Sequence, residues 1–333
     1  MALLFTESFD GILTGAKKWN TWHASNTIGP THGRDGTNGL FVSAGLAAVL
    51  VASRGILPAT SRVIAGCWAY ATNDGYDDED SILRFTSTAG SEIWVQWSSA
   101  TDAQFEVVGT GISRQQIGPQ GLGQRQTWAF VELMWQPGSA YEVRVNGLTI
   151  ASGTAGGSGT PNNFQIRQGT TLTGTLTQFR VDNIYVLDTS GSFNNDFLGP
   201  IVVRPLKPDG VGNRTELTPS EATDNYELVS DGDDETYVEG DEGEGDLYTF
   251  EDTGIAEPIL GVVQYWRSFD PLGGGMSGKA IARSGGNDYD GNTVVLPASL
   301  APAHAQPWDV DPDTSDLWDP TDLDAAEFGV EFA

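Results

Sequence analysis

The chain has 333 residues, of which 42 are glycine and 16 are proline, and its formal net charge at pH 7 is −28. So few lysines and arginines exclude nucleic-acid binding through counterion release, which needs a basic surface. Ten tryptophans, fourteen phenylalanines and nine tyrosines exclude a disordered acidic tail, because such tails are poor in aromatic residues. The sequence is therefore that of a folded acidic protein, long enough for two domains.

The N-terminal segment and the most apolar stretch give no targeting or membrane signal. Residues 1–7 lack the basic region and the apolar core of a secretory signal. The stretch from Gly39 to Ser53 has 15 residues, whereas a bilayer span requires about 20. We therefore expect no export by the secretory route and no membrane insertion, and we interpret residues 39–53 as two buried strands.

Short apolar or alternating runs, separated by Gly, Asn, Ser and Thr, continue through the first 190 residues. They predict strands at residues 3–9, 39–44, 47–52, 62–70, 81–87, 92–97, 104–108, 128–135, 141–145, 148–151, 164–167 and 176–187. The clearest signal is the hairpin at residues 141–151, where Asn146-Gly147 supplies the positive φ that a type I′ turn needs. Turn signals every eight to twelve residues, without a helical pattern, predict a two-sheet sandwich.

The second part of the chain differs in charge. Residues 1–200 carry a net charge of −5, and residues 201–333 carry −23. Such asymmetry indicates a domain boundary, so we predict domains at 1–190 and 201–333 with a linker at 191–200. Strands are predicted at residues 201–206, 247–250, 259–267, 279–283, 293–297 and 330–332, with one short helix at 322–328 that begins near Thr321 and ends at Gly329.

Seven segments, in one order along the chain, resemble a known family. They are Glu7-Ser8-Phe9-Asp10, the hairpin at 141–151, the strand at 179–188 and the segments at 191–199, 246–252, 284–291 and 318–329. The first three resemble the laminin-G-like, concanavalin-A-like jelly roll found in tailed-phage virion proteins, and the later ones are similar to phage virion proteins as well. The resemblance implies an all-β chain, with a jelly-roll sandwich followed by a smaller acidic β-sandwich-like domain.

The resemblance also implies a function. We expect a non-enzymatic structural protein of a bacteriophage virion, a capsid-decorating, neck or tail-associated subunit that forms a homo-oligomer and contacts other virion proteins. Such a protein is made in the bacterial cytoplasm without a signal peptide and resides in the virion. It requires no cofactor.

An enzymatic alternative depends on one strand. Sandwich glucanases that resemble this fold carry their two catalytic carboxylates in a Glu-x-Asp-x-Glu pattern on one strand face. Here the nearest segment is Glu92-Ile93-Trp94-Val95-Gln96, with Trp94 in place of Asp and Gln96 in place of the second Glu. Because a glutamine cannot serve as a general acid, the sequence predicts that the chain is not an enzyme, and a glycoside hydrolase acting through Glu92 is the remaining enzymatic hypothesis.

Sugar binding is the main alternative to a purely structural role. Trp94 and Trp97 are three residues apart on a predicted strand, so they point to opposite faces and only one belongs to the core. The other could stack on a pyranose ring. This hypothesis describes a receptor-binding adhesin whose jelly roll recognises a host-surface glycan.

A calcium site is a further prediction. The acidic segment at 231–242 places oxygen-bearing residues near EF-hand spacing: Asp231, Asp233, Glu235, Tyr237 through its carbonyl, Glu239 and Glu242. Thr236 stands where an EF-hand needs glycine, so the loop would have to be a different oxygen cage. The alternative is a solvated acidic loop.

Overall fold

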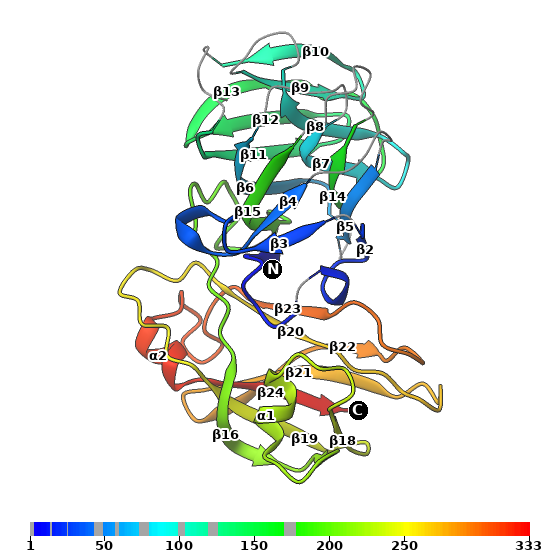
Figure 1. Ribbon diagram of the computed structural model, residues 1–333, viewed down its shortest axis with the longest axis vertical. Coiled ribbons are helices and arrows are strands. Elements are labelled where there is room, and N and C mark those ends of the chain that lie inside the picture. Colours follow the sequence, from blue (N-terminus) through cyan, green and yellow to red (C-terminus); the bar gives the residue numbers. More distant parts are fainter. Residues whose placement is uncertain are drawn as a thin grey trace. The chain divides into compact units, whose positions relative to one another are not determined.

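A computed structural model describes residues 3–13, 15–24, 26–42, 49–56, 60–72, 80–98, 104–118, 126–169 and 178–333. The chain forms two compact units: unit 1, Met1–Asp10 with Trp19–Val203, and unit 2, Gly11–Lys18 with Arg204–Ala333. Strands dominate both units (Figure 1), and the described helices are short, which confirms the predicted all-β class. The predicted strands at 39–44, 47–52 and 176–187 fall in part on residues 43–48 and 176–177, which lie outside the described residues. The finer domain limits remain predictions.

One sheet of unit 1 has the strand order β13-β12-β11-β6-β15-β4-β3, and β1 also pairs with β15. Its strands are β1 (Leu3–Glu7), β3 (Thr27–Gly29), β4 (Gly39–Val42), β6 (Val63–Ala71), β11 (Ala129–Gln136), β12 (Ala140–Val145), β13 (Leu148–Gly153) and β15 (Phe179–Leu187). The predicted hairpin is β12–β13, and its turn residues Asn146 and Gly147 have φ of 50° and 79°. Positive φ at both positions is what the Asn-Gly pair predicts.

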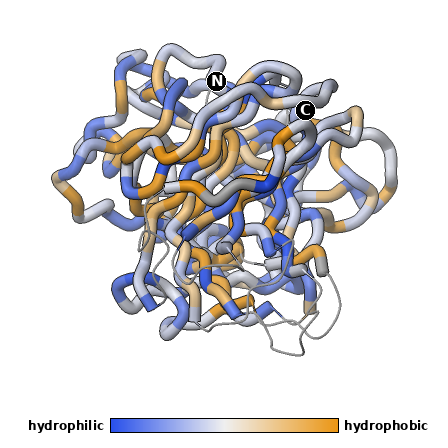
Figure 2. Tube along the Cα trace, turned by 90° about the horizontal axis from the view of Figure 1, so that it is seen from above, coloured by the Kyte–Doolittle hydropathy of each residue, from blue (hydrophilic) through white to orange (hydrophobic). Residues whose placement is uncertain are grey.

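The second sheet of unit 1 has the order β10-β9-β8-β7-β14-β5-β2. Its strands are β2 (Thr21–Trp22), β5 (Val49–Gly55), β7 (Ser81–Ser87), β8 (Glu92–Trp97), β9 (Phe105–Gly109), β10 (Ile112–Ile117) and β14 (Pro161–Gln168). All pairings in this sheet are antiparallel. Hydrophobic and hydrophilic stretches alternate along the trace (Figure 2), as expected where each strand has one face in the core.

The core of unit 1 lies between these two sheets. The ring of Trp97 on β8 lies 5.7 Å from that of Phe179 on β15, and Phe164 on β14 lies 6.1 Å from Trp19. Phe85, Phe164 and Phe179 are fully buried, and each such side chain contributes about 1.5–3 kcal/mol through burial. Large apolar groups therefore occupy these inward positions, and Arg84, Gln96 and Gln165 alternate with them and lie on the other face.

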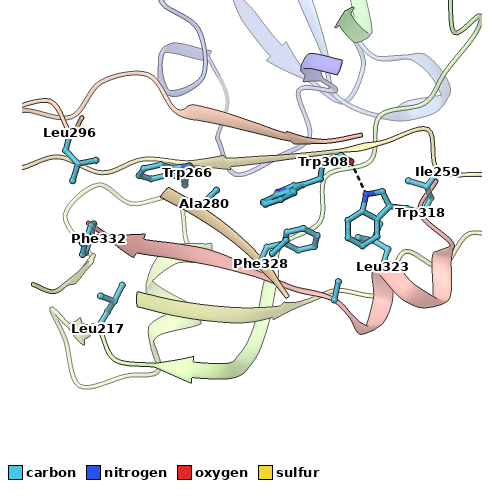
Figure 3. Close-up of a cluster of buried hydrophobic side chains, with 12 residues drawn as sticks. Leu217, Ile259, Trp266, Ala280, Leu296, Trp308, Trp318, Leu323, Phe328 and Phe332 are labelled. Carbon is cyan, nitrogen blue, oxygen red and sulfur yellow. Dashed lines mark hydrogen bonds between the residues drawn. The ribbon is translucent and has the colours of Figure 1, made fainter. Parts of the chain in front are cut away.

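Unit 2 has a five-stranded sheet in the order β16-β19-β24-β21-β22, and the ribbons β17–β18 and β20–β23. Its elements are β16 (Pro208–Thr215), β17 (Thr218–Pro219), α1 (Asn225–Ser230), β18 (Val238–Glu239), β19 (Gly245–Phe250), β20 (Val262–Trp266), β21 (Ser277–Ser284), β22 (Asn287–Val295), β23 (His304–Trp308), α2 (Pro320–Ala325) and β24 (Glu327–Phe332). Trp266, Trp308, Trp318 and Phe328 belong to its core cluster (Figure 3), where Trp318 Nε1 donates a hydrogen bond to the Trp308 carbonyl.

Two elements predicted after residue 200 need correction. The helix predicted at 322–328 is α2, which begins earlier because Asp319 caps it by accepting from Thr321 N and Pro320 occupies its first turn. The strand predicted at 201–206 does not form. Instead, the Ile201 carbonyl accepts from Trp68 Nε1 and Val203 N donates to Asn183 Oδ1, so side chains of unit 1 replace a backbone ladder.

Within the described ranges, no helix has the length and the apolar character that crossing a membrane would require.

Candidate functional site

Strand β8 divides its side chains between two environments. Ile93, Val95 and Trp97 point into the core and are at most 2% exposed. Glu92, Trp94 and Gln96 alternate with them, so they lie on the outer face of the β7–β8–β9 sheet. We call this surface the outer face, and it is the part of unit 1 where polar groups gather.

The strand register places residues of four strands in one row across the outer face. Gln165 of β14 pairs with Arg84 of β7, Arg84 pairs with Trp94 of β8, and Trp94 pairs with Val108 of β9. Directly paired residues have Cβ atoms about 4.5–5.5 Å apart. In the next row, Asn163 pairs with Thr86, and Thr86 pairs with Glu92. Arg84 therefore has Trp94 beside it and Asn163 and Glu92 on its two diagonals.

A hydrogen-bonded chain runs from β8 to β9 on this face. Trp94 Nε1 donates to Gln96 Oε1 at 2.6 Å, and Gln96 Nε2 donates to Glu106 Oε2 at 3.0 Å. Ser98 Oγ donates to Glu106 Oε1 at 2.9 Å, and Arg114 Nε lies 3.7 Å from Glu106 Oε2. Both oxygens of Glu106 are thus engaged, so this buried carboxylate orients Gln96 and, through it, the Trp94 indole.

Arg84 differs from these groups because part of its guanidinium is unused. The guanidinium carbon lies 4.7 Å from the centre of the Trp94 ring, and Nη2 forms an ion pair with Glu92. The side chain is only 6% exposed. Its Nε and Nη1 nevertheless have no hydrogen-bond partner in the described part of the chain, and neither does the buried Oδ1 of Asn163.

The outer face can therefore supply donors and an acceptor. Nε and Nη1 of Arg84 carry three of the five N–H donors of a guanidinium. Leaving such groups buried and unpaired costs about 1–3 kcal/mol each, and Asn163 Oδ1 adds an unpaired acceptor nearby. A ligand with several oxygen atoms would satisfy them.

Glu92 and Glu106, the carboxylates of β8 and β9, are too far apart to act as a hydrolytic pair. Because Gln96 pairs with Glu106, Glu92 lies four residues away along the strand direction, or about 14 Å at the usual rise. Glycosidases hold their two carboxyl groups about 5–9.5 Å apart. Glu92, whose side chain is 34% exposed, is the carboxylate of β8 that a ligand can reach.

The two tryptophans named from the sequence are thus separated. Trp97 packs against Phe105 and Phe179 in the core, so it is not placed to stack on a sugar. Trp94 lies on the outer face but is 8% exposed and covered by Arg84. Sequence reasoning missed Arg84 and Asn163. The only signal for Arg84 was a cation within the otherwise uncharged run of residues 81–87.

The acidic segment of the calcium prediction lies in unit 2, where it follows α1 and includes β18. Asp231 accepts from Asp233 N and Thr236 Oγ1, and Asp233 accepts from Glu235 N. Asp234, which the prediction did not include, pairs with Lys17 and Arg267. Among the described residues, no three His, Cys, Asp or Glu side chains are grouped closely enough to hold a metal. The structure does not gather the six predicted ligands, and calcium remains a prediction.

The opposite sheet of unit 1 contains buried acids of a different kind. The Tyr185 hydroxyl donates to Glu132 Oε1 at 2.5 Å, and burial raises the pKa of Glu132. Burial also raises the pKa of Asp182 on β15, to about 7. Backbone N–H groups of Gly199 and Arg34 donate to these two carboxyls. They fasten loops to the sheet, so we interpret both as structural.

Comparisons with known proteins place the fold. No protein-family model matches the chain, and no curated protein matches it. Solved structures that match include a cellulose-induced protein, Cip1 (12% identity, 55% of this chain and 96% of that chain, TM-score 0.42). Others are the Crh5 transglycosylase (12%, 57% and 85%, 0.41) and an endo-β-1,4-glucuronan lyase from Trichoderma reesei (14%, 55% and 94%, 0.38). At such identities the likeness concerns the fold alone, a jelly-roll sandwich, as predicted.

These matches overturn the predicted non-enzymatic virion protein. The proteins named above include a transglycosylase and a lyase, and none is a phage virion component. The prediction that the chain is not an enzyme was wrong in its reasoning, because it treated the missing Glu-x-Asp-x-Glu pattern as decisive. The missing pattern excludes one arrangement of two carboxylates on this strand and does not exclude catalysis of another kind. The predicted roles in the capsid, neck or tail of a virion are therefore unsupported as well.

Proposed function

We propose that unit 1 is a carbohydrate-active domain that binds a polysaccharide across the outer face, with Glu92 as the carboxylate next to the bound sugar. The observation that carries the proposal is the pairing of unused buried donors on Arg84 with an unused buried acceptor on Asn163. Sugars present closely spaced oxygens that both accept and donate hydrogen bonds. A binding site built from a few convergent polar groups fits such a ligand.

Trp94 supports Arg84 at this surface, because its ring is 8% exposed and lies against the guanidinium. Its indole is held by Gln96, which is held by Glu106, so the ring is fixed before a ligand arrives. Preorganised groups of this kind lose little entropy on binding. Arg84 lies over the ring, so the fixed ring in turn fixes the position of the guanidinium that would contact the sugar.

The first test is binding to a panel of soluble polysaccharides by affinity electrophoresis, using the full chain. We expect Trp94→Ala to weaken binding by about two- to thirtyfold, because it removes the cation–π contact that holds Arg84, and such contacts contribute about 0.5–2 kcal/mol. Trp128→Ala is the matched control, because Trp128 packs against Tyr70 of the opposite sheet. Equal losses in both variants, or no retention of the wild type by any polysaccharide, would contradict the proposal.

The second test concerns Glu92. If the polysaccharide that binds is also cleaved, we expect Glu92→Gln to lower kcat by about 100-fold or more, since a positioned acid or base contributes about 10²–10⁴-fold. Binding should persist, because the amide keeps the shape of the carboxylate. Glu142→Gln, on β12 of the opposite sheet, is the control. A Glu92→Gln variant that cleaves at the wild-type rate would remove Glu92 from the chemistry.

A further inference from the structure

We infer that the carbohydrate recognised by the outer face is acidic, and that Arg84 binds its oxyanion, a uronate carboxylate or a sulfate ester. This inference rests on the proposed function and narrows its substrate class. It starts from Arg84, which is 5% exposed and has Nε and Nη1 unpaired.

The arrangement of the open donors favours an oxyanion over a hydroxyl group. The open donors lie on both edges of the guanidinium, Nε–H on one edge and Nη1 on the other, with Nη2 between them. An oxyanion can accept along one edge, from Nε or Nη1 together with the second N–H of Nη2, whereas a single hydroxyl oxygen cannot accept two parallel N–H bonds equally well. A carboxylate or sulfate presents two or three oxygens on one rigid group. Hydrogen bonds between ionised partners are also roughly twice as strong as neutral ones, and the planar guanidinium matches the geometry of such anions.

The surroundings of Arg84 leave its charge available. Its one ionic partner among the described residues is Glu92, whose side chain is 34% exposed. Solvent therefore screens part of the Glu92 charge. Glu106, the carboxylate of the neighbouring strand β9, is already bound by Gln96 and Ser98 and lies beside Arg114. Gln165 and Trp94, the residues that flank Arg84 in its row, are uncharged.

The high negative charge of the whole chain does not oppose this. Residues 1–200 carry a net charge of only −5, and most of the excess is in residues 201–333. Exposed charges farther apart than about 8 Å are largely screened at physiological ionic strength. The local contact with a buried guanidinium therefore decides the preference.

Matched pairs of polysaccharides test the inference, because each pair differs in charge and shares a backbone. The pairs are polygalacturonate with its methyl ester, and dextran sulfate with dextran. We expect the wild type to bind at least one charged member about tenfold or more tightly than its neutral partner, as a charge-assisted hydrogen bond worth about 1.5–3 kcal/mol implies. A preference within the first pair identifies a carboxylate as the ligand group, and a preference within the second identifies a sulfate.

Variants of Arg84 assign that preference to one side chain. Arg84→Gln should abolish it, Arg84→Lys should retain part of it, and the control Arg144→Gln, on the opposite sheet, should leave it intact. Glu92→Gln is an independent variant that keeps Arg84: removing the competing carboxylate should strengthen binding of the charged member several-fold. Equal affinity for both members of each pair would overturn the inference and leave the proposed function standing, whereas no binding to any polysaccharide would overturn both.

Discussion

Replacing Asp246 with alanine is expected to lower the free energy of unfolding of unit 2 by about 3–5 kcal/mol, as for a buried charge network that loses one partner. Asp246 is fully buried. It accepts hydrogen bonds from Glu216 N, Leu217 N, Asn225 Nδ2 and the Tyr248 hydroxyl. It thus joins β19 to the turn after β16 and to α1, and alanine would leave four donors without their acceptor.

Hydrogen exchange resolves this loss by region, which suits a chain of two units. We expect the amides of residues 216–217 and 245–248 to exchange faster in Asp246→Ala, while those of β7 and β8 remain unchanged. Asp252→Ala is the matched control, because Asp252 is exposed. The exchange rates give a free energy of opening for each amide. If these free energies differ between Asp246→Ala and the wild type by less than about 1 kcal/mol, water replaces the lost hydrogen bonds at little cost, which would contradict the prediction.

Unit 1 is expected to lose about 2–3 kcal/mol of stability between pH 5 and pH 8 through Asp182, a pKa difference of one unit being worth about 1.4 kcal/mol. The folded state raises the pKa of this carboxyl to about 7, chiefly by burial, and Asp10 adds to the effect. The folded chain therefore holds a proton that the unfolded chain, with its ordinary carboxyl pKa, has already released. Stability from this group is complete below about pH 4 and is lost as the pH rises through 7.

Urea unfolding at pH 5 and at pH 8, followed by exchange at β15, measures this change. Asp182→Asn removes the titration and should flatten the pH profile of unit 1. Arg34 N, Thr37 Oγ1 and Asn183 N donate to this carboxylate in the wild type, so the variant will also be less stable at both pH values. A wild type equally stable at pH 5 and pH 8, or a variant with the same decline as the wild type, would contradict the assignment.

The sequence was informative wherever local chemistry decides the structure. The strands at 81–87 and 92–97 have the predicted limits, because alternating apolar residues are bounded by turn residues. The strand β16 was missed, since its residues Gly210 and Gly212 carry no β signal. A side chain at Gly212 would collide with the Leu247 carbonyl, so tertiary packing, invisible in the sequence, requires that glycine.

The candidate site was predicted only in part for the same reason. Strand parity alone indicates that Trp94 and Trp97 face opposite ways. It does not indicate that Arg84 lies beside Trp94, or that Asn163, far along the chain, lies diagonal to Arg84. Those neighbours depend on register between strands that pair across long loops, and the unpaired donors of Arg84 become visible only once the register is known.

The most direct test of a carbohydrate site on the outer face is a crystal structure of the full chain with an oligosaccharide cut from whichever polysaccharide it binds. We expect sugar oxygens within hydrogen-bond distance of Nε or Nη1 of Arg84 and of Oδ1 of Asn163, with Glu92 in contact with the same sugar. A sugar bound to the opposite sheet or to unit 2, with those three atoms still unpaired, would contradict it.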